Sequence, residues 1–115
     1  MTKRTPWGDV QQQHKIAEGI TVCYTASHGG IILSEDKAKK LGHIRYMNFL
    51  KSAKYWEEDC DWAIPFFFFS DEIKRFGFFS ESGFEEMIGS AVKTIELQGI
   101  SLQSLNKKGG EIETS

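Results

Sequence analysis

The residues of this sequence that could do chemistry are a histidine among small residues and an acidic cluster around a cysteine. His28 lies in the segment TASHGG, and Glu58, Asp59 and Cys60 lie in the segment YWEEDCDWA. A thiol is a good nucleophile, and an imidazole is its usual base. These residues would suit a small hydrolase or transferase, provided that the fold brings His28 next to Glu58, Asp59 or Cys60.

The helical periodicity of the same segment favours a structural role for Cys60. Written as a helix, Trp56, Cys60, Ala63 and Phe67 share one apolar stripe. Free cysteines are among the most buried residues of proteins. We therefore interpret Cys60 as a core residue and assign no catalytic residue, so an enzyme is the alternative rather than the leading hypothesis.

Metal binding is a third possibility, and the spacing of the potential ligands argues against it. Neither His-x-x-x-His nor Glu-x-x-His occurs, so we expect no metal ion and no other cofactor. The carboxylates are better interpreted as a solvated helix face opposite the apolar stripe, or as partners for basic residues. The potential ligands are His14, His28, His43, Glu57, Glu58, Asp59 and Asp61.

The segment TASHGG has two interpretations of its own. Exposed amides beside glycines can bind an anion, with His28 at the rim. The pair Gly29-Gly30 is also a typical two-residue hairpin turn. Ile20, Val22 and Tyr24 alternate with smaller or polar residues, as in a half-buried strand, and the apolar residues 31–33 would form the return strand. We favour the turn.

Two helices flank the central part of the chain. Ser34 is a good N-cap, followed by acidic residues and then by lysines and Gly42, so a helix is expected over 34–42. Residues 43–54 are interpreted as helix, with strand as the alternative. Ser82-Gly83-Phe84-Glu85 resembles a capping box, which predicts a helix from there to Gly99.

Between those helices, we expect the helix that contains Trp56 to end or kink near Pro65, because proline lacks the backbone N–H. The phenylalanine run 66–69 cannot face the core with every ring, so one or two rings should lie in an exposed patch. Glu57, Glu58 and Asp61 would form its acidic rim. The expected binding residues are Trp7, His28, Glu57, Glu58, Asp61, Phe66 and Phe68.

Length and composition place these elements in one small domain. The 115 residues predict a single α+β domain over 1–105, an antiparallel hairpin packed by about three helices, with an N-terminal arm held by Trp7 and a disordered tail over 106–115. No apolar run is long enough to span a bilayer, and residues 1–10 do not form a signal peptide, so a cytoplasmic protein without a membrane partner is expected.

The net charge of −2 does not favour a nucleic-acid partner, but the charge is unevenly distributed. Residues 1–56 contain nine Lys or Arg and four Asp or Glu, whereas residues 57–115 contain five and twelve. Such asymmetry is typical either of an interaction face or of two halves that attract each other within one fold.

Three segments in the same order resemble a family of small domains of unknown function. They are TPWG at 5–8, TASHGGI at 25–31 and YWEEDCDWA at 55–63, and the resemblance covers about residues 5–69. It implies a protein encoded by a bacteriophage, plasmid or other mobile element. By association, it implies an accessory protein that binds another protein, such as a component of host defence, and inhibits it in the cytoplasm of the host. Self-association is the other partner expectation.

Overall fold

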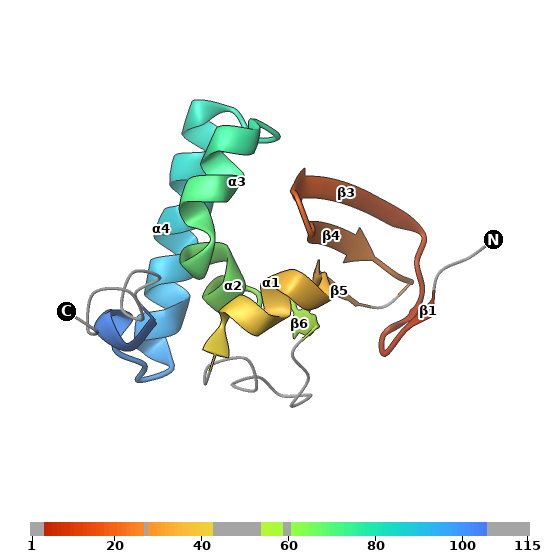
Figure 1. Cartoon of the computed structure of the whole chain (residues 1–115), viewed down its shortest axis with the longest axis horizontal. Coiled ribbons are helices and arrows are strands. Elements are labelled where there is room, and N and C mark those ends of the chain that lie inside the picture. The colour runs from red at the N-terminus through yellow and green to blue at the C-terminus, as the bar shows by residue number, and fades with distance from the viewer. Residues whose placement is uncertain (1–3, 27, 43–53, 59–60, 106–115) are drawn as a thin grey trace.

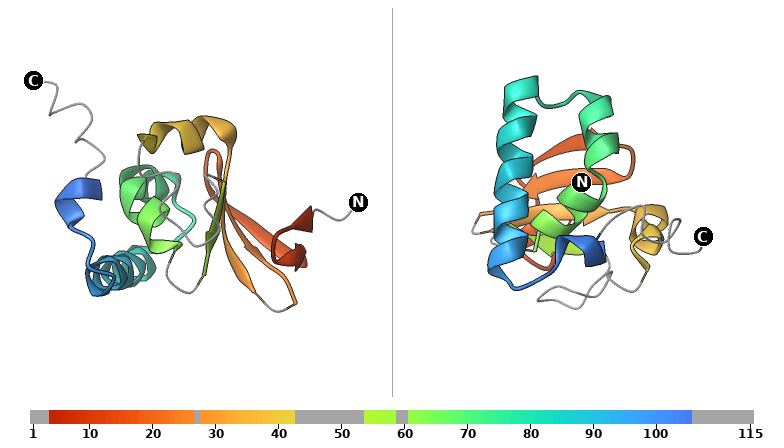
Figure 2. Two further views of the ribbon diagram at one scale, coloured as in Figure 1. Left: turned by 90° about the horizontal axis from the view of Figure 1, so that it is seen from below. Right: turned by 90° about the vertical axis from the view of Figure 1, so that its left-hand side faces the viewer.

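The computed structural model describes residues 4–26, 28–42, 54–58 and 61–105. In these residues, an antiparallel sheet of strands β3–β6 has helices α2–α4 on one side (Figure 1). A short ribbon of β1 (Arg4–Thr5) and β2 (Gly8–Asp9) lies on the opposite side, as the left panel of Figure 2 shows. The predicted α+β class is confirmed.

The sheet has the order β3-β4-β5-β6, with each pair antiparallel. Its strands are β3 (Gln12–Ala17), β4 (Ile20–Tyr24), β5 (Gly29–Leu33) and β6 (Tyr55–Glu57). The predicted hairpin is present, with Ile20 opposite Leu33. Strand β3 was not predicted, because its polar sequence resembles an arm. The segment that was expected to be an N-terminal arm therefore forms the short ribbon β1–β2 and, after it, the edge strand β3.

The hairpin turn lies earlier than predicted. Gly29 and Gly30 are strand residues, paired with Tyr24 and Cys23, so the turn lies between Tyr24 and Gly29. The backbone N–H of Thr25 donates to the carbonyl of His28 at 2.7 Å and closes this turn. The prediction of a Gly-Gly turn is wrong because β5 needs glycines for a different reason, the close approach of neighbouring residues.

Helix α1 (Glu35–Lys40) begins as predicted. The side chain of Ser34 accepts a hydrogen bond from the backbone N–H of Lys37 at 3.2 Å, and Gly42 follows with a φ of +60°. Lys37 then forms an ion pair with Glu72 of helix α3 (Ser70–Phe76). This pair connects α1 to the helical layer.

The segment around Trp56 is a strand rather than a helix. Trp56 lies opposite Ile31 in the ladder between β5 and β6, and its side chain is fully buried. Pairing with β5 has overridden the helical pattern of the sequence. Helix α2 (Ala63–Phe68) starts after this strand, and Pro65 lies in its first turn, where its missing N–H is not required. The predicted role of Pro65 as a helix terminator is therefore wrong.

Helix α4 (Glu81–Leu97) is the long helix predicted near the C-terminus. Its N-cap is Ser80, whose hydroxyl accepts from the N–H of Gly83 at 3.1 Å, so the predicted cap at Ser82 is two residues late. Gly99 follows the helix with a φ of +79°, as expected. The short 3₁₀ helix η2 (Leu102–Leu105) completes the described chain.

The core lies between the sheet and helices α2–α4. It consists mainly of apolar residues from β3–β6 and the inner faces of the helices. Phe66 and Phe69 belong to it, with 1% and 2% exposure, whereas Phe67 and Phe68 are half-buried against it. The prediction that Phe66 lies at an exposed face is therefore wrong.

Several predictions concern residues outside the described ranges. These are the helix over 43–54 (apart from Lys54), the core position of Cys60, the roles of His43 and Asp59, and the tail over 106–115.

Candidate functional site

The three sequence segments that carry the family resemblance meet at one end of the sheet. Residues 5–8 span the turn between β1 and β2, residues 25, 26 and 28 lie between β4 and β5, residues 29 and 30 begin β5, and residues 55–58 form β6 and the residue after it. The backbone N–H of Glu58 donates to the carbonyl of Gly29 at 2.9 Å and extends the ladder. We call this region the hairpin end.

Gly30 allows the hairpin end to pack closely. A Cβ atom at this position would lie 2.3 Å from the carbonyl oxygen of Trp56 and 2.7 Å from Cη2 of Trp7. The ring of Trp7 also meets Tyr55 edge-on, with 5.9 Å between centroids. Its buried indole N–H has no hydrogen-bond partner among the described residues. Packing against Gly30 and Tyr55 therefore holds Trp7 in place, and its binding role stays a prediction.

One threonine joins two of the segments, and another closes the turn within the first. The hydroxyl of Thr25 lies 3.1 Å from the carbonyl of Trp7 and 2.8 Å from that of His28, and it accepts from the N–H of His28. The hydroxyl of Thr5 donates to the carbonyl of Gly8 at 2.8 Å. These bonds explain why both segments contain a threonine, and they fix the shape of the hairpin end.

Four side chains at the hairpin end remain at the surface. His28 is 49% exposed and its Nδ1 lies 3.7 Å from Oε2 of Glu57. Tyr24 is 43% exposed. Tyr24 and the exposed Glu58 both lie against Gly29, whose Cβ position is 3.0 Å from Cδ1 of Tyr24 and 3.4 Å from Oε1 of Glu58. Tyr24 and Glu58 lie on one side of the sheet beside Gly29, whereas Glu57 is paired with Gly30 and lies on the other side, with His28 near it. We call Tyr24, His28, Glu57 and Glu58, which border this end of the sheet from both sides, the hairpin-end face.

The structure brings together only part of the predicted site. His28 and Glu57 are neighbours, the Trp7 ring and Glu57 both pack at Gly30, and Glu58 lies on the other side of the sheet against Gly29. Asp61 is only 5% exposed, so its predicted place at an acidic rim is wrong. Tyr24 was not predicted as a site residue. Its position opposite Gly29 in the hairpin register would have revealed it, had the turn been placed correctly.

The structure places His28 near a different carboxylate from those in the catalytic hypothesis. The carboxylate near its imidazole is that of Glu57, because Glu58 lies against Gly29 and Tyr24 instead. Asp59 and Cys60 are outside the described residues. Within the described part of the chain, no group of three or more His, Cys, Asp or Glu is arranged to bind a metal ion.

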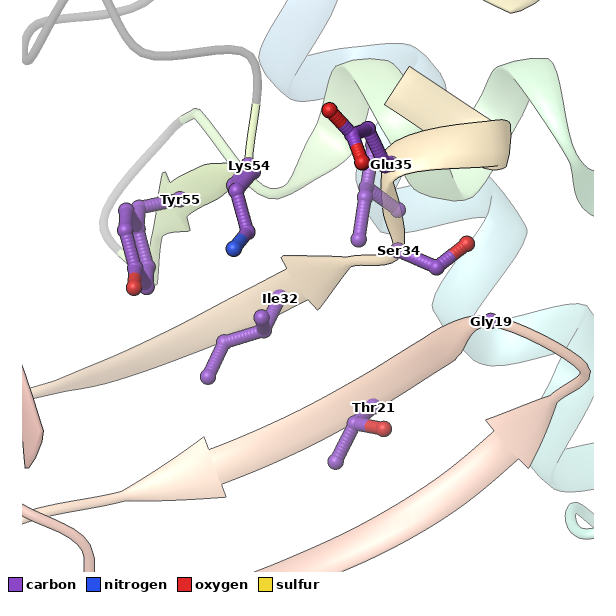
Figure 3. Close-up of a pocket in the computed structure, with 8 residues that line it drawn as sticks. Gly19, Thr21, Ile32, Ser34, Glu35, Lys54 and Tyr55 are labelled. Carbon is purple, nitrogen blue, oxygen red and sulfur yellow. The ribbon is translucent and has the colours of Figure 1, made fainter. Parts of the chain in front are cut away.

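A shallow pocket of about 220 Å³ lies toward the opposite end of β4 and β5, near Gly19 and Ser34 (Figure 3). In the close-up, Thr21 of β4, Ile32 of β5, Tyr55 of β6 and Lys54 just before β6 point toward it. The Lys54 ammonium lies 6.0 Å from the Tyr55 ring centroid, and the Ser34 hydroxyl accepts the capping bond of α1. These two polar groups of the pocket therefore already interact within the fold.

A second exposed region lies at the turn between α3 and α4, at the top of Figure 1. Phe76 is 45% exposed and Phe78 is 47% exposed. The Phe78 ring lies 5.4 Å from that of His14 on β3 and 5.0 Å from that of Phe79. The sequence analysis did not predict this exposed region, because it assigned the exposed rings to the longer phenylalanine run at 66–69.

Comparison with known proteins identifies the family. The model of the DUF7007 family, a domain of unknown function, matches residues 1–110. No curated protein and no solved structure is similar to the chain at a significant level. None of the helices in the described ranges is long and apolar enough to cross a membrane. Since the match covers nearly the whole chain, the protein belongs to the DUF7007 family of domains of unknown function.

Proposed function

We propose that this protein acts by binding another protein, and that the hairpin-end face is its docking surface. The main support is the contrast within the hairpin end. Trp7, Thr25 and Gly30 have structural contacts that account for them, whereas Tyr24, His28 and Glu58 are exposed. Exposed aromatic and charged side chains on a rigid support are typical of binding surfaces.

The chemistry of the face suggests what it binds. Glu57 and Glu58 provide two carboxylates on either side of the β5 backbone, and Tyr24 provides an amphipathic ring. A partner segment with lysine or arginine beside an apolar or aromatic residue complements this face. Carboxylates at such a rim increase the association rate and select the partner, while the ring contributes to affinity.

The biological setting of this proposal comes from the sequence. The three segments of the hairpin end resemble domains encoded by bacteriophages, plasmids and other mobile elements. A small protein of that kind that binds a component of host defence would act as an inhibitor. We include this counter-defence role in the proposal, and we place the protein in the cytoplasm of the host cell.

The enzyme alternative rests on the pair of His28 and Glu57, in which a carboxylate could orient an imidazole as a general base. It predicts that folded His28→Ala protein loses a turnover activity. Under the binding proposal, His28→Ala only weakens a complex.

Affinity purification with two charge-reversed variants tests the proposal. The first variant, Glu57→Lys/Glu58→Lys, alters the hairpin-end face. The second, Glu85→Lys/Glu86→Lys, changes the net charge equally at two exposed, adjacent residues of α4. The tagged wild-type protein and both variants are expressed in the native cell, and recovered proteins are quantified by mass spectrometry.

We expect the recovery of a specific protein to fall about tenfold with Glu57→Lys/Glu58→Lys and to be unchanged with Glu85→Lys/Glu86→Lys. Melting curves confirm that both variants are folded. If every recovered protein responds equally to the two variants, or to neither, the hairpin-end face is not a docking surface.

A further inference from the structure

The turn between α3 and α4 has the chemistry that the hairpin-end face requires of a partner. We call Lys74, Arg75, Phe76 and Phe78 the helix tip. We propose that the helix tip of one copy of this protein docks on the hairpin-end face of a second copy. This inference rests on the proposed function, since it names a partner for the same face.

The helix tip combines exposed aromatic rings with positive charge. Phe76 and Phe78 are each nearly half exposed, and Lys74 and Arg75 precede them as exposed residues of α3. Residues 74–80 contain these two positive charges and no carboxylate; of the two carboxylates one turn earlier on α3, Glu72 pairs with Lys37 and Asp71 is exposed. The first carboxylate after this range, that of Glu81, lies in the first turn of α4, where the helix dipole stabilises it.

The Phe78 ring of the helix tip is held by contacts with His14 and Phe79, which favours binding. Gly77 has a φ of +84° and ends α3 in the left-handed conformation that L side chains rarely adopt. Phe79 beneath the tip meets Phe66 at 5.8 Å, and Phe66 is part of the core. Exposed rings on a rigid turn lose little conformational entropy on binding.

The two surfaces complement each other in sign and in ring content. The hairpin-end face has Tyr24 and Glu58 on one side of the sheet and Glu57 on the other, whereas the helix tip has Lys74, Arg75 and two phenylalanines. Opposite charges around aromatic contacts are typical of specific interfaces. This complementarity is separate from the charge asymmetry between residues 1–56 and 57–115, because both carboxylates and the helix tip lie in the second of these ranges.

The two surfaces lie on different parts of the molecule. In Figure 1 the α3–α4 turn is at the top, and the turn between β4 and β5 is on the right-hand side of the sheet. One copy can therefore use both surfaces at once. A contact of this head-to-tail kind leaves one free surface of each type in a dimer, so assembly continues into longer chains or closes into a ring.

Sedimentation velocity on the full chain tests this inference. The hairpin variant is Glu57→Lys/Glu58→Lys and the tip variant is Arg75→Glu/Phe78→Ser, with Arg75→Glu/Phe76→Ser as a substitute if the tip variant does not fold. The wild-type protein should form oligomers larger than a dimer as its concentration rises. Each variant alone should show an association constant at least about tenfold lower, while Glu85→Lys/Glu86→Lys should associate like wild type.

Mixing the two variants gives the sharpest result. The hairpin variant keeps an intact helix tip and the tip variant keeps an intact hairpin-end face, so an equimolar mixture should form dimers of one copy of each and nothing larger. A wild-type protein that stays monomeric, or a mixture that forms no dimer, overturns the inference. Either result leaves the proposed function standing, because the affinity purification tests binding of the hairpin-end face to other proteins.

Discussion

Two groups of phenylalanines, only seven residues apart, have opposite places in this molecule. Phe66 and Phe69 are almost completely buried, whereas Phe76 and Phe78 are each nearly half exposed. The first pair lies on or next to α2, which packs between the sheet and α4. The second pair flanks Gly77, at the turn that leaves the helical layer.

The difference arises from periodicity and not from residue type. Residues three apart on a helix share one face, so Phe66 and Phe69 both point to the core while Phe67 and Phe68 lie at its edge. Phe76 is the last residue of α3, and the left-handed Gly77 after it takes the chain, with Phe78, out of the helix. An apolar residue is therefore a candidate for binding because of its place in the fold, not because of its hydrophobicity.

The largest effect should follow from changing the buried group. Phe66 stacks on Phe84 of α4 at 5.9 Å and also meets Trp62 at 5.5 Å, so Phe66→Ala leaves a cavity between α2 and α4. We expect the free energy of unfolding to fall by about 3–5 kcal/mol. Urea denaturation measures this loss. A decrease below about 1 kcal/mol would mean that Phe66 is not a core residue.

A smaller effect should follow from changing the turn between the groups. Gly77→Ala places a side chain on a residue with a φ of +84°, although the nearest atom outside its immediate neighbours, the carbonyl oxygen of Arg75, would be 4.0 Å from the new Cβ. The cost is therefore conformational, about 1–2 kcal/mol. Thermal melting would measure it, and an unchanged melting temperature would show that the turn does not have this conformation.

The smallest effect on stability should come from the exposed group. Phe78→Ser removes the contacts with His14 and Phe79, but half of the ring is already in water, so we expect a loss of about 1 kcal/mol. Its effect on association should be larger than its effect on stability. If Phe78→Ser were as destabilising as Phe66→Ala, the two groups would not differ and the helix tip would be part of the core.

Local signals in the sequence were sufficient for some elements. Alternation predicted β4, and the cap at Ser34 and the glycine at 42 predicted α1, because the bonds that form these features lie within a few residues. The long apolar period predicted α4, although Ser80 rather than Ser82 provides its cap. The α+β class follows from these elements.

Features that depend on distant contacts were not predictable in the same way. Gly30 is a glycine because Trp7 and Trp56 approach it from two other segments, and no local pattern contains that information. Trp56 became a strand residue through pairing with Ile31. For the site, the sequence identified His28, Glu57 and Glu58 as candidates but not Tyr24, since that choice required the correct register of the hairpin.

Site-specific photo-crosslinking from the hairpin-end face tests the central claim most directly. A photoreactive phenylalanine analogue replaces Tyr24 in one variant and Leu97, the most exposed large apolar residue described, in a control. The account predicts that position 24 forms crosslinks to a segment containing lysine or arginine beside an apolar ring, and that Glu57→Lys/Glu58→Lys removes them. Crosslinks of equal yield from positions 24 and 97, or crosslinks from position 24 that survive the charge reversal, would contradict it.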